Sequence, residues 1–76
     1  MEQIYEILSN LRPEFDYHTS QDYIADNLLD SFDIVSLVSE LEERYGIFID
    51  ALDILPENFK NASAIADVVI KNGGEL

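Results

Sequence analysis

Residues 30–46 decide the fold of this chain, and they read DSFDIVSLVSELEERYG. Apolar side chains recur in this stretch at intervals of three and four residues, which is the spacing of one helix face. They are Ile34, Leu37, Val38, Leu41 and Tyr45. Asp30 suits the N-cap of a helix, and Gly46 suits the left-handed residue that ends one. We therefore predict a helix from Ser31 to Tyr45, ~22 Å long.

Two more helices are expected, one on each side of this central helix. Residues 2–11 carry an apolar stripe at helical spacing, and Pro13 brings that helix to an end. Residues 63–71 carry a second such stripe, and Asn72-Gly73-Gly74 forms its stop.

The segments between the helices are expected to be ordered. Residues 12–29 hold too many large apolar side chains for a flexible linker, and residues 21–25 could form a short helical turn. Residues 47–49 are expected to be an extended crossover, and residues 52–56 a short helix. The predicted fold is all-α, a small four-helix bundle of three main helices and one short helix. Residues 1–76 form a single domain.

Charge is the strongest bulk feature of the sequence. Sixteen acidic and four basic residues give a formal net charge of −12. Such a charge repels nucleic-acid phosphates and attracts basic partners, so we expect no nucleic-acid binding. The simpler alternative is that the acidity only keeps the protein soluble.

Several classes of chemistry are unexpected in this chain. There is no cysteine, and the single histidine, His18, is expected to be a surface loop residue. The three glycines form no phosphate-binding loop, and Asp50 and Asp53 lack the spacing of a Ca²⁺ loop. We predict no catalytic residue, no metal site and no enzymatic activity. No apolar run approaches the ~20 residues of a membrane span, and no secretory signal is visible, so we expect a cytoplasmic monomer.

Ser31 is the candidate functional residue. It stands where a loop becomes a helix, and free N–H groups and the helix dipole favour a covalently attached phosphodiester there. The alternative is that Asp30 and Ser31 only cap the helix. Phe32 and Val35 share a face with Ser39 and Glu42, away from the core stripe, and either could instead tuck under the preceding loop. The adjoining polar face would consist of Asp33, Ser36, Glu40 and Glu43. These two faces predict a docking surface for basic partners.

The stretch from Leu29 to Val35, followed by Leu41-Glu42-Glu43-Arg44-Tyr45-Gly46-Ile47, resembles the acyl carrier and peptidyl carrier family. Residues 56–59 and 62–69 resemble later helices of that family. The resemblance implies that Ser31 receives 4′-phosphopantetheine from coenzyme A, and that Asp30 helps the phosphopantetheinyl transferase recognise the site. It further implies partner-binding roles for Phe32, Asp33, Val35, Ser39, Glu42 and Glu43. Partners would be the transferase and acyl-transferring or ligase enzymes with basic patches.

Three positions depart from the family pattern. Phe32 replaces the usual Leu, Ser36 stands where fatty-acid carriers often have Glu, and Asn27 replaces a glycine. Asn27 also tolerates left-handed backbone. The cargo would be an acyl or aminoacyl thioester of fatty-acid synthesis or of a specialised pathway, and D-alanyl or other aminoacyl carriers are an alternative to fatty-acid carriers. An alternative of another class is an unmodified acidic interaction module.

Overall fold

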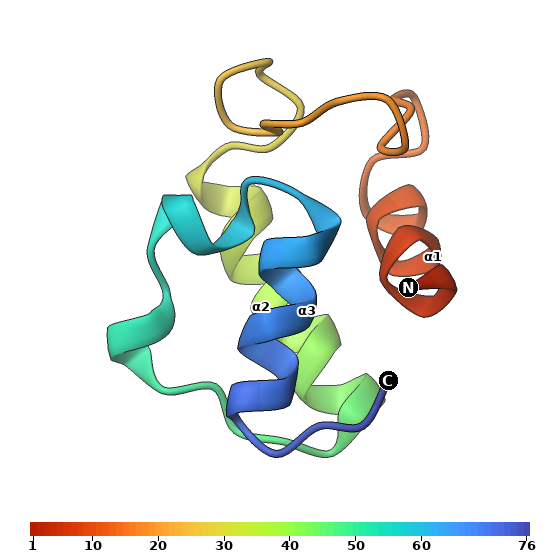
Figure 1. The fold of residues 1–76 in the computed structure, drawn as a ribbon. Coiled ribbons are helices and arrows are strands. Elements are labelled where there is room, and N and C mark those ends of the chain that lie inside the picture. The colour runs from red at the N-terminus through yellow and green to blue at the C-terminus, as the bar shows by residue number, and fades with distance from the viewer.

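The computed structural model describes residues 1–76 and contains three α-helices and no strand (Figure 1). Helix α1 spans Glu2–Leu11, α2 spans Ser31–Tyr45 and α3 spans Ala62–Lys71. Two short 3₁₀ helices, η1 at Ala51–Asp53 and η2 at Pro56–Phe59, lie between α2 and α3. The predicted all-α fold is confirmed, and the three main helices agree with their predicted bounds to within one residue.

Helix α2 is capped at both ends, by side chains at its start and by a left-handed backbone residue at its end. The Asp30 carboxylate accepts a hydrogen bond from the Asp33 N–H at 2.9 Å, and the Asp33 carboxylate accepts one from the Asp30 N–H at 3.0 Å. This reciprocal capping box satisfies two backbone donors that the first turn would otherwise leave unpaired. At the other end Gly46 adopts φ +63°, where a residue with a Cβ is strained.

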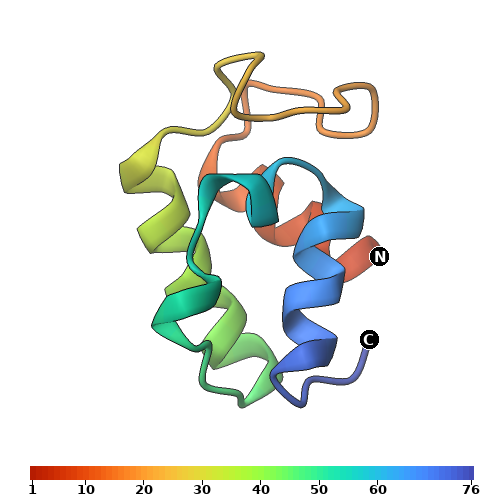
Figure 2. The same ribbon diagram turned by 60° about the vertical axis from the view of Figure 1, so that its left-hand side comes forward.

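The core forms where α1 and η2 each contact both α2 and α3 (Figure 2). Each α-helix contributes one apolar face to it, as amphipathic helices do when they bury a stripe against each other. The largest fully buried side chains are Tyr23, Phe59, Ile4, Ile7, Leu8, Leu37, Leu41, Ile65 and Val69. The stripe predicted for α2 is thus confirmed as its buried face, with Tyr45 at its half-buried end.

Residues 12–30 form one long connection across the end of the molecule where α2 begins (Figures 1 and 2). The Tyr23 hydroxyl donates to the Tyr17 carbonyl at 2.7 Å, and the Tyr17 hydroxyl donates to the Arg12 carbonyl at 3.0 Å. The two buried rings also meet edge to face, with centroids 5.2 Å apart. The connection is therefore ordered by its own side chains, as predicted.

The helical turn considered for residues 21–25 forms as one isolated turn, in which the Asp26 N–H donates to the Asp22 carbonyl at 3.0 Å, and no longer helix follows it. The Asp22 carboxylate accepts hydrogen bonds from the N–H groups of Ile24 and Ala25, as the N-cap side chain of a helical turn does. Asn27 then adopts φ +61° and reverses the chain. The tolerance of Asn27 for left-handed backbone is used here.

The segment from residue 47 to residue 61 contains no strand, and residues 47–49 are an extended crossover, as predicted. The short helix expected at residues 52–56 forms as η1 at Ala51–Asp53, and a second 3₁₀ helix, η2, begins at Pro56. Leu55 precedes Pro56 and adopts extended backbone (φ −122°, ψ 141°), as residues before proline prefer, so one helix cannot run through it. The segment is fastened to α3 by Asp53, which accepts from the Lys71 ammonium at 2.7 Å.

No helix of the fold combines the length and the apolar composition that crossing a membrane requires.

Candidate functional site

Ser31 is the first residue of α2, and its side chain is exposed. The N-cap position belongs to Asp30, whose carboxylate binds the backbone of the first turn. The Ser31 hydroxyl makes no hydrogen bond to the protein. Capping, the alternative role considered for this serine, is therefore performed by its neighbour, and the hydroxyl is accessible to a second molecule.

The backbone around Ser31 offers a favourable environment for a negative charge. The N–H groups of Ser31 and Phe32 have no partner within the protein, as is usual for the first residues of a helix. The positive end of the α2 dipole lies at the same place, and both features stabilise an attached phosphate group. The carboxylates of Asp30 and Asp33 oppose this effect, so the electrostatics of the site depend on how these two acids are compensated.

Asp33 does not lie on the exposed polar face, where the sequence placed it. Its side chain is only 11% exposed, and both its carboxylate oxygens accept from the Nε of Arg12, at 3.1 and 3.2 Å. Burial alone would raise the pKa of Asp33, but the hydrogen bonds from Arg12 and the Asp30 N–H, with the charge of Arg12, hold that pKa below its usual value. The prediction that Asp33 lies on the exposed polar face is therefore wrong.

Phe32 and Val35 are exposed, as predicted for an apolar face beside the serine. The side chain of Phe32 is 85% exposed and that of Val35 is 63% exposed, so neither tucks under the preceding loop. Ser39, one turn further along α2, is also exposed. The structure thus leaves two large apolar groups in solvent within the first two turns after the candidate attachment point.

The two adjacent glutamates near the end of α2 differ in their surroundings. Glu42 is half-buried, and its carboxylate accepts from the Ile49 N–H at 2.9 Å, which fixes the extended crossover after α2. Glu43 is exposed and makes no hydrogen bond or ion pair. Of the three acids to which the resemblance gave partner-binding roles (Asp33, Glu42 and Glu43), Glu43 is therefore the one whose carboxylate is exposed and unpaired.

Arg12 belongs to the site although the sequence analysis did not single it out. Besides Asp33, its guanidinium lies 3.3 Å from a Glu14 oxygen and 3.6 Å from an Asp30 oxygen. Nothing in the spacing between positions 12 and 33 predicts this contact. The one available signal was the scarcity of basic residues. With only four basic and sixteen acidic residues, each basic residue is expected to pair with an acid.

Phe48 and Leu52 were also missed, and both lie between α2 and η2. Their side chains are 84% and 82% exposed. In the sequence the apolar run at residues 47–49 gave no sign of which side chains face solvent. Ile49 is in fact the buried member of this run, at 3% exposure.

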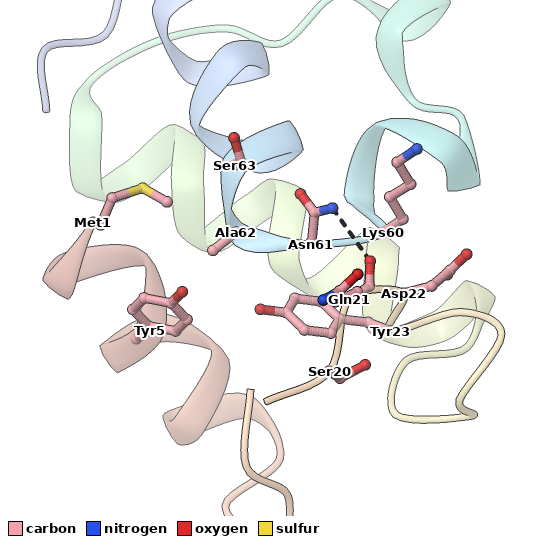
Figure 3. A pocket seen from close by; sticks show the side chains of 10 residues that line it. All are labelled: Met1, Tyr5, Ser20, Gln21, Asp22, Tyr23, Lys60, Asn61, Ala62 and Ser63. Carbon is pink, nitrogen blue, oxygen red and sulfur yellow. Dashed lines mark hydrogen bonds between the residues drawn. The ribbon is translucent and has the colours of Figure 1, made fainter. Parts of the chain in front are cut away.

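A cavity of about 440 Å³ lies beside the middle of the 12–30 connection, at residues 20–23, between the start of α1 and the start of α3 (Figure 3). Tyr5, Tyr23 and Lys60 contribute to its lining, and Asn61 donates to the Gln21 carbonyl at 3.2 Å across one side. None of the five main cavities includes Ser31, Phe32 or Val35. Ser31 is thus a surface site rather than the floor of a pocket.

His18 lies on the surface, as expected, with its side chain 61% exposed. Its ring stacks on Tyr5 at a centroid distance of 3.9 Å, which attaches the 12–30 connection to α1. The residue packs against the fold and is paired with no nucleophile.

No family model matches this chain, and neither the curated proteins nor the solved structures contain a significant match to it.

Proposed function

We propose that this chain is a carrier protein that bears 4′-phosphopantetheine on the Ser31 oxygen. The observation that carries the proposal is the state of Ser31: it is exposed, it opens α2, and Asp30 performs the capping in its place. A phosphodiester at this position would meet the unpaired N–H groups and the positive dipole end of α2. The resemblance of residues 29–47 to acyl and peptidyl carriers supports the same reading.

The attachment step would be a phosphoryl transfer from coenzyme A. The Ser31 oxygen would bond to the phosphorus next to pantetheine, the diphosphate bond would break, and the nucleotide half of coenzyme A would leave. A phosphopantetheinyl transferase would accept the serine proton. The arm then supplies the thiol that a chain without cysteine lacks.

The loaded protein would carry an acyl or aminoacyl thioester between enzymes of fatty-acid synthesis or of a specialised pathway, including D-alanyl transfer. The chain itself would catalyse no step. Phe32 and Val35 would meet apolar surface on each partner, and Glu43 would meet a basic residue. Apolar contacts combined with charges that attract a basic partner suit transient binding to several enzymes.

The test is phosphopantetheinylation of the purified protein in vitro. The protein is incubated with coenzyme A and a broad-specificity phosphopantetheinyl transferase, and its intact mass is measured. We expect a gain of one phosphopantetheinyl group in the wild type. The Ser31→Ala variant should gain nothing, whereas Ser9→Ala, a change at an exposed serine of α1 outside the predicted partner-binding residues, should be modified like the wild type. No gain in the wild type, or a gain that survives Ser31→Ala, would sink the proposal.

An unmodified acidic interaction module is the second candidate, and the exposure of Phe32 and Val35 is the observation that favours it. It predicts that the protein binds a basic partner with the same affinity before and after Ser31→Ala. Glu43→Lys would weaken that binding. Glu43 is a better choice than Glu42 for this test, because Glu42 also fixes the chain after α2.

A further inference from the structure

Arg12 joins the two ends of the 12–30 connection. It follows directly after α1, and its guanidinium binds Asp33 in the first turn of α2, 21 residues further along the chain. The Arg12 carbonyl accepts from the Tyr17 hydroxyl, so its backbone is held as well. One residue thus closes the connection at the place where α2 begins.

The contact with Arg12 acts on the geometry of the residues around Ser31. One Asp33 oxygen accepts both from Arg12 and from the Asp30 N–H, and the Asp33 N–H donates back to Asp30. Arg12 therefore fixes the orientation of the carboxylate that, in turn, fixes the backbone on either side of Ser31. A guanidinium suits this task because its planar fork of donors can meet several carboxylates at once.

Arg12 also supplies the compensating charge that this end of α2 needs. Three carboxylates, those of Glu14, Asp30 and Asp33, lie within 3.6 Å of its guanidinium. Without Arg12 the buried Asp33 would have no cation, and its charge would oppose both the ordering of the turn and an incoming phosphate. The other arginine pair, Arg44 with Glu6, offers a contrast, because Glu6 is 62% exposed and holds no backbone group.

We infer that Arg12 is a positioning residue for the Ser31 acceptor, acting through Asp33 to fix the Asp30–Ser31 turn in the form that the transferase modifies. This inference rests on the proposed function of Ser31. It assigns Arg12 no contact with coenzyme A or with the transferred group. It predicts that the rate of modification depends on a residue far from Ser31 in sequence.

The experiment measures kcat/KM of the transferase for four forms of the protein: wild type, R12Q, R12K and R44Q. We expect R12Q to lower kcat/KM about tenfold, the factor that corresponds to one lost charge-assisted contact in the reacting conformation. R12K should recover part of the rate, because an ammonium can neutralise Asp33 but cannot also reach Asp30 and Glu14. R44Q removes an arginine from a comparable surface pair and should leave the rate within about twofold of wild type. If R12Q does not fold, the kcat/KM of R12K is compared with that of R44Q. A lower value for R12K supports the inference, and equal values overturn it.

A double-mutant cycle with Asp33→Asn separates positioning through Asp33 from other roles. If Arg12 acts through Asp33, R12Q should have little further effect on kcat/KM in the Asp33→Asn background. Fully additive effects would overturn the inference, as would an R12Q rate equal to that of wild type. If the wild-type protein gains no mass on incubation with coenzyme A and the transferase, both the proposed function and this inference are refuted. Normal modification of R12Q refutes the inference only.

Discussion

Replacement of Asp33 by asparagine tests the link between α1 and α2 most sharply. The change keeps the shape of the side chain but removes the charge that faces Arg12. A hydrogen bond to a charged group contributes roughly 1.5–3 kcal/mol, and we take the lower end, about 1.5 kcal/mol, because water replaces part of the contact. That water can reach Arg12, whose side chain is 36% exposed. For a domain of this size the loss corresponds to a fall in Tm of about 6–12 °C.

The assay is thermal unfolding followed by far-ultraviolet circular dichroism, with Asp67→Asn as the matched control. Asp67 is exposed on α3 and makes no ion pair or hydrogen bond, so its replacement changes the net charge equally without removing a contact. Because the chain is strongly acidic, this control should unfold at or slightly above the wild-type temperature. Equal Tm values for Asp33→Asn and Asp67→Asn would refute the reasoning.

The same variant has a defined pH dependence. The pKa of Asp33 is lowered in the folded protein, so its stabilising effect is complete above the unfolded value of about 3.9 and is lost as pH falls through the folded value. The difference in stability between wild type and Asp33→Asn should therefore be constant from pH 5 to 7. At about one pH unit above the unfolded pKa and higher, the Asp33 carboxyl is ionised in both the folded and the unfolded state. It should shrink toward zero in stronger acid. A difference that grows as the pH falls would contradict the assignment.

Three further predictions concern stability. Lys71→Met should lower the Tm, because it leaves the buried Asp53 carboxylate without its cation. Lys60→Met should not lower the Tm, because Lys60 forms no ion pair, and thermal unfolding of both variants checks this. Phe59→Ala should cost about 3–5 kcal/mol in urea unfolding, since it removes the fully buried aromatic side chain that ends η2; a loss under about 1 kcal/mol would contradict the packing described. Added NaCl should raise the Tm of the wild type by screening its −12 charge, and a Tm independent of salt would mean that the charges are compensated locally.

The sequence predicts the helices well because each carries its own signals. In α2 the apolar period, the Asp30 cap and the Gly46 stop all agree, and such agreement between levels leaves few alternatives. The short segments were harder to predict, because single contacts decide them. The Asp22 carboxylate caps a single turn at residues 22–26, and the extended backbone of Leu55 before Pro56 separates η1 from η2.

The candidate site was predicted in part, for a similar reason. The exposure of Phe32 and Val35 follows from their place opposite the core stripe, which the helix period alone determines. The burial of Asp33 depends on Arg12, which a long connection brings back to the start of α2. No local pattern contains that information, and so the exposure predicted for Asp33 was wrong while the exposure predicted for Phe32 and Val35 was right.

Modification of Ser31 is tested by the intact mass of the protein purified from cells that make it naturally. If Ser31 bears the arm, the mass will exceed that of the bare chain, with the addition located on the peptide that contains Ser31 and released as a phosphopantetheine thiol or its thioester. The released acyl or aminoacyl group would also identify the cargo. A protein whose Ser31 carries no addition in such cells, or whose addition lies on another residue, would contradict the account.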